Sequence, residues 1–191
     1  MNLFSGSALL PLLPNLITLT RLFSVPLMVW LILEQRFAPA FWLFVAAGVS
    51  DALDGFLARK LKLRSTVGAF LDPLADKALL VGVYVTLGHM NYVAEWLVII
   101  VVFRDIIIIG GAILYQTLTQ SLKMQPLFVS KVNTVAQIGL AALLLARQGL
   151  GFNDFGLTDY LVYAVAATTI VSGGAYVFVW GRRYIGMEPS K

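Results

Sequence analysis

Six long apolar stretches, separated by short polar turns, constrain the fold of this chain more than any other feature. Only 13% of the 191 residues are charged, about half the share found in an ordinary soluble domain. Each stretch has roughly the 20 residues that a helix needs to cross the hydrocarbon layer of a bilayer. The predicted spans are 15–33, 38–59, 67–88, 96–118, 129–146 and 160–180. The chain is therefore expected to be an all-α, polytopic membrane protein with six transmembrane helices.

The N-terminal segment differs from a targeting sequence. Residues 1–13, MNLFSGSALLPLL, contain no lysine or arginine, whereas a secretory signal begins with a basic region. We expect a short interfacial helix there, followed by a six-helix bundle over residues 15–184. No internal repeat or low-complexity segment divides the sequence. Residues 1–191 are therefore predicted to form a single membrane domain.

Basic residues are distributed unevenly between the two sets of turns. One side of the predicted membrane receives few of them, Arg36 and Arg147. The other side receives Lys60, Lys62, Arg64, Lys123, Arg182, Arg183 and Lys191. Because positive residues collect on the cytoplasmic side of a membrane, both termini are expected in the cytoplasm. The expected location is a bacterial cytoplasmic (inner) membrane.

Four aspartates, Asp51, Asp54, Asp72 and Asp76, interrupt the second and third apolar stretches. A charged side chain in a bilayer is costly unless it is paired or coordinated, and like charges close together repel one another. Residues three and four apart share a helix face, so each helix carries its two acids on one stripe. A hairpin centred near Leu63 would place Asp51 opposite Asp76 and Asp54 opposite Asp72. The carboxylates are therefore expected to converge on one point, open toward the cytoplasm.

The remaining composition limits what compensates these charges. The chain has no cysteine and one histidine, so a metal here would have oxygen ligands, which favours magnesium, manganese or calcium. Two divalent ions would cancel four carboxylates, in the arrangement that enzymes use for phosphoryl-type transfer. Two alternatives remain open. The acids form ion pairs with Arg21, Lys77 and Arg104, or they line a path through a small cation or proton transporter.

Other polar residues also lie within the apolar stretches. Arg104 and Asp105 are adjacent and so are expected to point apart on a helix, which favours Arg104 as a ligand for a substrate phosphate over a mutual ion pair. Lys131 is either an interfacial anchor or a second anion ligand. A polar stripe in the first stretch, which either lines a pocket or joins helices by hydrogen bonds, comprises Asn15, Thr18 and Arg21.

The stretch DALDGFLARKLKLRSTVGAFLDPLAD, residues 51–76, resembles the motif of the CDP-alcohol phosphotransferases, also called CDP-alcohol phosphatidyltransferases. Its matching positions are Asp51, Asp54, Gly55, Ala58, Arg59, Gly68, Asp72 and Asp76. The resemblance extends to PNLITLTR (14–21) and FVSKVNT (128–134). Members of this family are six-span integral membrane homodimers. They transfer a phosphatidyl or related group from a CDP-linked donor to an alcohol and release CMP.

The resemblance implies a role for each matching residue. The metal ligands, for two Mg²⁺ or Mn²⁺ ions, would be Asp51, Asp54, Asp72 and Asp76, and Asp76 would also be the general base. The residues along the CDP moiety would be Asp51, Asp54, Gly55, Ala58, Arg59 and Gly68. The acceptor or its phosphate would contact Arg104, Lys131 and Asn133. The expected partners are CDP-diacylglycerol, the acceptor, membrane lipids and a second copy of the chain, with no nucleic acid.

Two segments bear on the acceptor. FVSKVNT and TTIVSGGAYVFVWGRR (168–183) most resemble the CMP-forming cardiolipin synthases, whose acceptor is phosphatidylglycerol. The enzymes that use glycerol 3-phosphate more often have GKVKT, with a second lysine where this chain has Asn133. A small dianion needs extra positive charge for its capture from water, whereas phosphatidylglycerol carries one charge and is already in the membrane. Phosphatidylglycerol is therefore the predicted acceptor, with glycerol 3-phosphate as the alternative.

Overall fold

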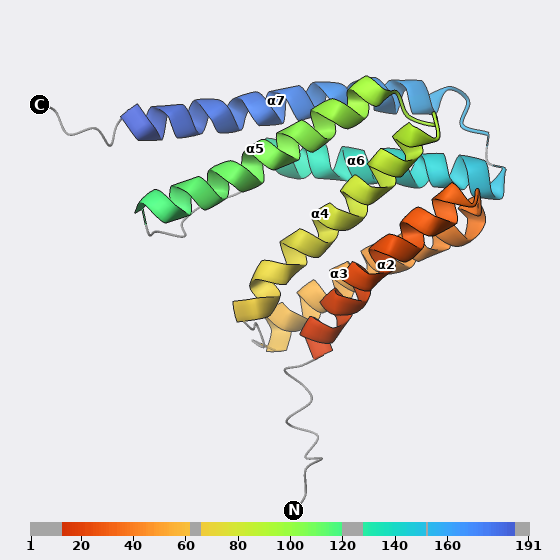
Figure 1. Ribbon diagram of the computed structural model, residues 1–191, viewed down its shortest axis with the longest axis horizontal. Helices are drawn as coiled ribbons and strands as arrows, with labels where there is room; N and C mark the ends of the chain where they lie inside the picture. The colour runs from red at the N-terminus through yellow and green to blue at the C-terminus, as the bar shows by residue number, and fades with distance from the viewer. Residues whose placement is uncertain (1–12, 62–65, 120–127, 152, 186–191) are drawn as a thin grey trace, which may run out of the picture. The chain divides into compact units, whose positions relative to one another are not determined.

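Six α-helices make up the chain over the residues that the computed structural model describes, which are 13–61, 66–119, 128–151 and 153–185. Side chains are described within 19–53, 75–111, 128–151 and 153–179. The helices are α2 (Leu13–Leu33), α3 (Phe37–Leu61), α4 (Thr66–His89), α5 (Glu95–Thr119), α6 (Phe128–Leu150) and α7 (Leu157–Ile185) (Figure 1). No strand occurs over these ranges. The all-α class is therefore confirmed, while the expected interfacial helix over residues 1–13 lies almost wholly outside the described residues.

Each helix coincides with one predicted apolar stretch, and the largest differences lie at the end of α6 and at both ends of α7, which continues to Ile185, five residues past its predicted end. Helix α6 continues to Leu150, four residues past the predicted end, and α7 begins three residues early, at Leu157. The early start has a local cause. Asp154 accepts a hydrogen bond from the backbone N–H of Thr158 at 3.0 Å, and its own carbonyl accepts one from Leu157 at 2.8 Å. A side-chain carboxylate satisfies the first N–H groups of a helix in this way.

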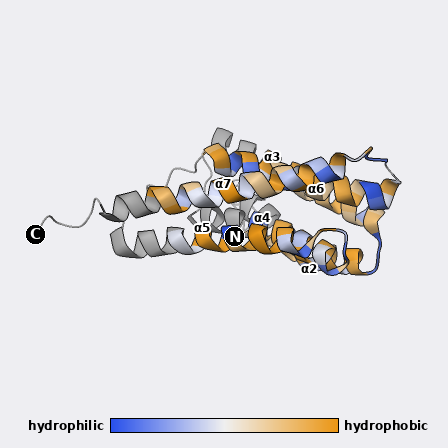
Figure 2. Cartoon of the chain, turned by 90° about the horizontal axis from the view of Figure 1, so that it is seen from above, coloured by the Kyte–Doolittle hydropathy of each residue, from blue (hydrophilic) through white to orange (hydrophobic). Residues whose placement is uncertain are grey.

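The described helices carry long hydrophobic runs (Figure 2), and many of their large apolar side chains are exposed. Phe23, Val135 and Ile170 expose 73%, 70% and 65% of their surface. A soluble monomer rarely exposes large contiguous apolar patches, so these faces fit contact with lipid. Among the described residues, two helical segments are both long and apolar enough to cross a membrane, Phe128–Leu150 and Leu157–Val179. The count of six transmembrane helices remains a prediction.

The chain divides into two compact units. The first covers residues 1–92 and 141–153, and in it α2 packs against both α3 and α4. Met28 and Ile32 of α2 and Val83 of α4 are fully buried in its core. Gly82 allows close packing here, because a Cβ at this position would lie 3.3 Å from Cγ1 of Val25. Because α2 packs against both α3 and α4, side chains of α2 can contact residues of either helix.

The second unit covers residues 93–140 and 154–191 and contains α5, most of α6 and α7. Helix α5 packs against α7. Leu97, Leu140 and Val165 are completely buried in its core. Polar residues are buried as well, among them Arg104, Asn133 and Ser172. Buried polar groups need partners, and these residues are connected by the network described below.

Candidate active site

Three helices of the first unit meet at one nitrogen atom. Nη1 of Arg21 on α2 donates to Oδ1 of Asp51 on α3 and also to Oδ1 of Asp76 on α4. The Arg21 side chain is only 2% exposed, whereas each carboxylate side chain is 44% exposed. The guanidinium therefore lies on the buried side of the two carboxylates. The hairpin geometry predicted Asp51 opposite Asp76, and the structure brings both to the same point.

Small residues and locally satisfied hydroxyls surround this meeting point. Ala75, next to Asp76, and Ala47, one turn before Asp51, are both buried. Small side chains at such positions let membrane helices approach closely. Ser24 and Ser50 donate back to carbonyls of their own helices, at 2.6 and 2.8 Å. These hydroxyls are thus engaged within one helix, and the charged side chains connect the three helices.

The electrostatics of this cluster favour a further cation. One guanidinium faces two carboxylates, so the trio of Arg21, Asp51 and Asp76 has a net charge of −1. Like charges this close repel unless they are balanced. The donors are carboxylate oxygens, which suit magnesium or manganese, and both carboxylates remain accessible. The residues thus fit a divalent metal ion.

The other members of the motif are described only by their backbone. Asp54, Gly55, Ala58 and Arg59 belong to α3, and their side chains, like those of Gly68 and Asp72 on α4, lie outside the described ones. The helical backbone puts Asp54 on the face of Asp51, and Asp72 on the face of Asp76. Among the described side chains no three acids or histidines gather as a metal site, but that set excludes Asp54 and Asp72. Asn15 and Thr18 of the polar stripe are likewise known only as backbone of α2.

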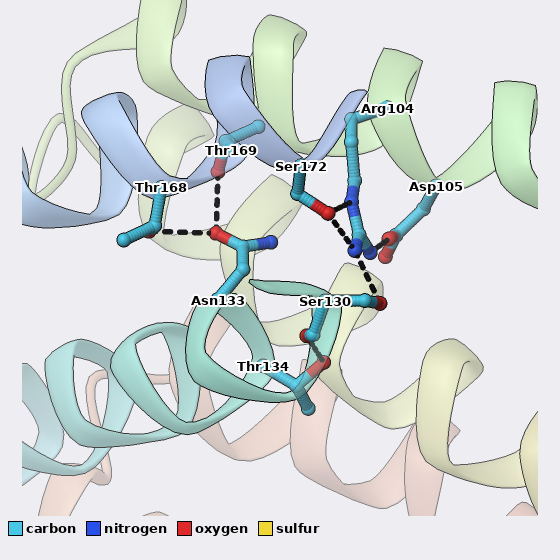
Figure 3. A network of polar contacts seen from close by, with 8 residues as sticks. All are labelled: Arg104, Asp105, Ser130, Asn133, Thr134, Thr168, Thr169 and Ser172. Atoms are coloured by element: carbon cyan, nitrogen blue, oxygen red, sulfur yellow. Dashed lines mark hydrogen bonds and ion pairs between the residues drawn. The ribbon is translucent and has the colours of Figure 1, made fainter. Parts of the chain in front are cut away.

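A second polar cluster surrounds Arg104 in the other unit (Figure 3). Arg104 is 3% exposed, and its Nη1 lies 2.6 Å from Oδ1 of Asp105. Its Nη2 donates to the hydroxyls of Ser130 on α6 and Ser172 on α7, each at 2.6 Å. The expectation that Arg104 and Asp105 point apart is therefore wrong. The Cα–Cβ bonds of adjacent helical residues do point apart, but the long arginine side chain is flexible enough to reach the carboxylate of Asp105.

Asn133 joins α6 to α7 next to this cluster. It is fully buried, and its Oδ1 accepts hydrogen bonds from the hydroxyls of Thr168 and Thr169, both at 2.9 Å (Figure 3). Its Nδ2 has no hydrogen-bond partner within the described part of the chain. Lys131, two residues earlier, is exposed. The three predicted acceptor residues thus differ in setting, because Arg104 and Asn133 are enclosed and Lys131 is accessible.

The sequence-based prediction missed the hydroxyl groups of this cluster. Ser130 and Ser172 contact Arg104, and Thr168 and Thr169 contact Asn133. Serine and threonine are common in membrane helices, where they bond to their own backbone, so composition alone does not mark them. The signal that was present is their place in FVSKVNT and TTIVSGG, the segments that also carried the family resemblance.

Comparison with known proteins agrees with this motif. A model of the CDP-alcohol phosphatidyltransferase family matches residues 11–172. The chain is 35% identical to the chloroplastic CDP-diacylglycerol–glycerol-3-phosphate 3-phosphatidyltransferase 1 of Oryza sativa subsp. japonica, over 94% of this chain and 59% of the relative. It is 33% identical to the CMP-forming cardiolipin synthase of Rattus norvegicus, over 93% of this chain and 64% of the relative.

A bacterial relative is matched over nearly its whole length. The CDP-diacylglycerol–glycerol-3-phosphate 3-phosphatidyltransferase of Bacillus subtilis is 30% identical over 86% of this chain and 92% of the relative. The chain thus spans less than two thirds of the rice and rat relatives and most of the bacterial one. The family model and these relatives lead to one conclusion: the chain belongs to the CDP-alcohol phosphatidyltransferase family.

Proposed function

We propose that this chain transfers a phosphatidyl group from CDP-diacylglycerol to the hydroxyl of phosphatidylglycerol, giving cardiolipin and CMP. The observation that carries the proposal is the convergence of Asp51 and Asp76, from two helices, at Arg21. Residues 1–191 would act as a single membrane domain with six transmembrane helices, paired with a second copy. Its active site would face the cytoplasm of a bacterial inner membrane.

Divalent metal is part of this proposal. Asp51, Asp54, Asp72 and Asp76 would hold two Mg²⁺ or Mn²⁺ ions, and the two acids whose side chains are described present accessible carboxylate oxygens. Such ions, when bound, neutralise the diphosphate of the donor and the phosphate of departing CMP. The CDP moiety would lie along the helix faces that carry Gly55, Ala58, Arg59 and Gly68.

The protein side chains would supply the proton transfer. Asp76 accepts the proton of the acceptor hydroxyl while the hydroxyl oxygen forms a bond to the phosphorus that bears diacylglycerol. The bond from this phosphorus to the bridging oxygen of the diphosphate breaks, and CMP leaves with that electron pair. The exposure of Asp76 permits an acceptor to approach it. No covalent intermediate with the protein is needed.

The preference for phosphatidylglycerol is supported by position 133. Asn133 is neutral and enclosed between two threonine hydroxyls, and the charge of nearby Arg104 is balanced by Asp105. Less positive charge is therefore available for a dianion than a lysine at position 133 would supply. Glycerol 3-phosphate remains the second candidate, since relatives of both activities match and Lys131 is accessible.

The test offers each acceptor separately to the purified protein. Protein in detergent receives CDP-diacylglycerol and Mg²⁺ or Mn²⁺, with either phosphatidylglycerol or glycerol 3-phosphate, and the lipid products are resolved. Cardiolipin formation with CMP release supports the proposal. Product with glycerol 3-phosphate alone transfers the assignment to phosphatidylglycerophosphate synthesis. No CMP with either acceptor, together with cation or proton flux through proteoliposomes, would favour the transporter alternative.

A further inference from the structure

Arg21 places a buried positive charge beside two aspartates of the acidic motif. It comes from α2, outside the motif, and one of its nitrogens donates to both Asp51 and Asp76. Its side chain is 2% exposed, while the two carboxylates are 44% exposed. The guanidinium therefore contacts the acids from the interior and leaves their outer surface accessible.

This placement solves an electrostatic problem of the metal-free protein. Two carboxylates from two helices that meet at one point repel each other, and the repulsion grows as water is excluded. A guanidinium keeps its positive charge in proteins and binds carboxylates strongly. Arg21 thus holds α3 and α4 together at the point where the acids would otherwise separate them.

We propose that Arg21 is the internal counter-ion of the acidic site: it stabilises the metal-free protein and lowers the affinity of the site for divalent ions. The inference rests on the proposed function in one respect, that this site takes a divalent metal. It assigns Arg21 a positioning role in which it contacts the metal ligands rather than the substrate, a kind of contact that tunes metal sites generally.

Two opposing effects decide the direction of the change in metal affinity. Removal of Arg21 takes away one contact that orders the two aspartate side chains, and their ordering by a metal then opposes binding slightly. It also removes a positive charge that shares both carboxylates with the metal, and this Coulomb repulsion is the larger effect at such short range. Loss of the charge should therefore tighten metal binding, on the order of tenfold or more.

The experiment measures binding of Mn²⁺ alone to the full chain in detergent, with free Mn²⁺ followed by electron paramagnetic resonance. Arg21→Met removes the charge and keeps an unbranched side chain, whereas Arg21→Lys keeps the charge. Arg36→Met is the matched control, because Arg36 is exposed and follows the end of α2 at Leu33, which lies roughly 18 Å along the helix axis from Arg21. Thermal unfolding of each variant is recorded in EDTA and in saturating Mn²⁺.

The counter-ion role predicts a specific pattern. Arg21→Met unfolds at a lower temperature than wild type in EDTA, recovers most of the difference in Mn²⁺, and binds Mn²⁺ on the order of tenfold more tightly. Arg21→Lys and Arg36→Met bind Mn²⁺ like the wild type. A variant that folds only when purified with Mn²⁺ supports the role too, since the ion then replaces the missing charge.

Several results would overturn the inference. Unchanged or weaker Mn²⁺ binding by Arg21→Met, an equal loss of stability with and without Mn²⁺, or tighter binding by Arg21→Lys would each show that the charge does not act on the metal. Absence of Mn²⁺ binding to the wild type would do the same. Failure of the proposed function is a separate result, in which Mn²⁺ binds but no CMP is released from CDP-diacylglycerol.

Discussion

Arg104 and Asp105, neighbours on helix α5, form a buried ion pair with 2.6 Å between Nη1 and Oδ1. Both side chains are less than 5% exposed. Nη2 of Arg104 donates to the hydroxyls of Ser130 and Ser172. Asp105 thus balances the charge of Arg104, and Arg104 connects α5 with α6 and α7.

Replacement of Asp105 should therefore destabilise the protein strongly. Asp105→Asn leaves a buried guanidinium without its counter-charge, which should lower the free energy of unfolding by about 3–5 kcal/mol. Chemical unfolding in detergent measures the loss. Asp159→Asn is the control, since Asp159 is exposed in the first turn of α7 and its loss should cost under about 1 kcal/mol. Equal effects of the two substitutions would show that the buried pair adds nothing.

Gly149 should not tolerate a larger residue. A Cβ at this position would lie 2.5 Å from the backbone nitrogen of Ala38 and 2.6 Å from the carbonyl carbon of Phe37. Backbone atoms cannot move aside cheaply, so Gly149→Ala should lower the free energy of unfolding by about 1–3 kcal/mol. Gly139→Ala, on the same helix with open space around it, should instead be neutral or stabilising, because alanine favours helix. A neutral Gly149→Ala would contradict the close approach of α6 and the start of α3.

Asn133 and Lys131 should separate stability from acceptor use. Asn133→Ala removes the acceptor of two threonine hydroxyls, one of them on the fully buried Thr169, and should lower the free energy of unfolding by about 1–3 kcal/mol.

Lys131→Met, at an exposed position, should change the free energy of unfolding by less than about 0.5 kcal/mol. It should raise KM for the acceptor and not KM for CDP-diacylglycerol. Unfolding curves and initial rates with each substrate varied distinguish the two. A KM for the acceptor that Lys131→Met leaves unchanged would remove this residue from the acceptor site.

Sequence patterns predicted much of the fold, for identifiable reasons. Long apolar runs between polar turns locate all six helices, because each run has about the length of one helix and the polar residues gather at the turns between them. The bounds of the α6–α7 connection were predicted less accurately, because a capping contact of Asp154 sets the start of α7. Helix ends depend on single side-chain contacts of this kind, which hydropathy does not reveal.

The candidate site was predictable in part. Helical spacing predicted Asp51 opposite Asp76, and the structure brings both acids to Arg21 of α2, the helix against which α3 and α4 both pack. The contact of Arg21 with both acids was only one alternative, because it depends on how α2 rotates and packs against α3 and α4. The relation of Arg104 to Asp105 was predicted wrongly, because the direction of the Cα–Cβ bond does not decide where a flexible arginine side chain reaches.

Loss of a metal ligand should abolish turnover and leave the protein folded. Asp51→Asn or Asp72→Asn removes a ligand charge and should abolish turnover, because the loss of charge stabilisation in the transition state costs several kcal/mol. The initial rate at saturating Mn²⁺ is the measurement, with size-exclusion profiles to verify folding. A variant that keeps more than roughly a tenth of the wild-type rate, a loss of less than about 1.4 kcal/mol, would rule out its role as a metal ligand.

The most direct test of phosphatidyl transfer with Asp76 as the general base is CMP release by Asp76→Asn, measured beside binding of CDP-diacylglycerol. The wild type should release CMP from CDP-diacylglycerol when phosphatidylglycerol and Mn²⁺ are present. Asp76→Asn should be slower by about 10²–10⁴-fold, the usual contribution of a general base, while it still binds the donor. A variant that releases CMP at close to the wild-type rate, or a wild type that releases none with any alcohol, would contradict the account.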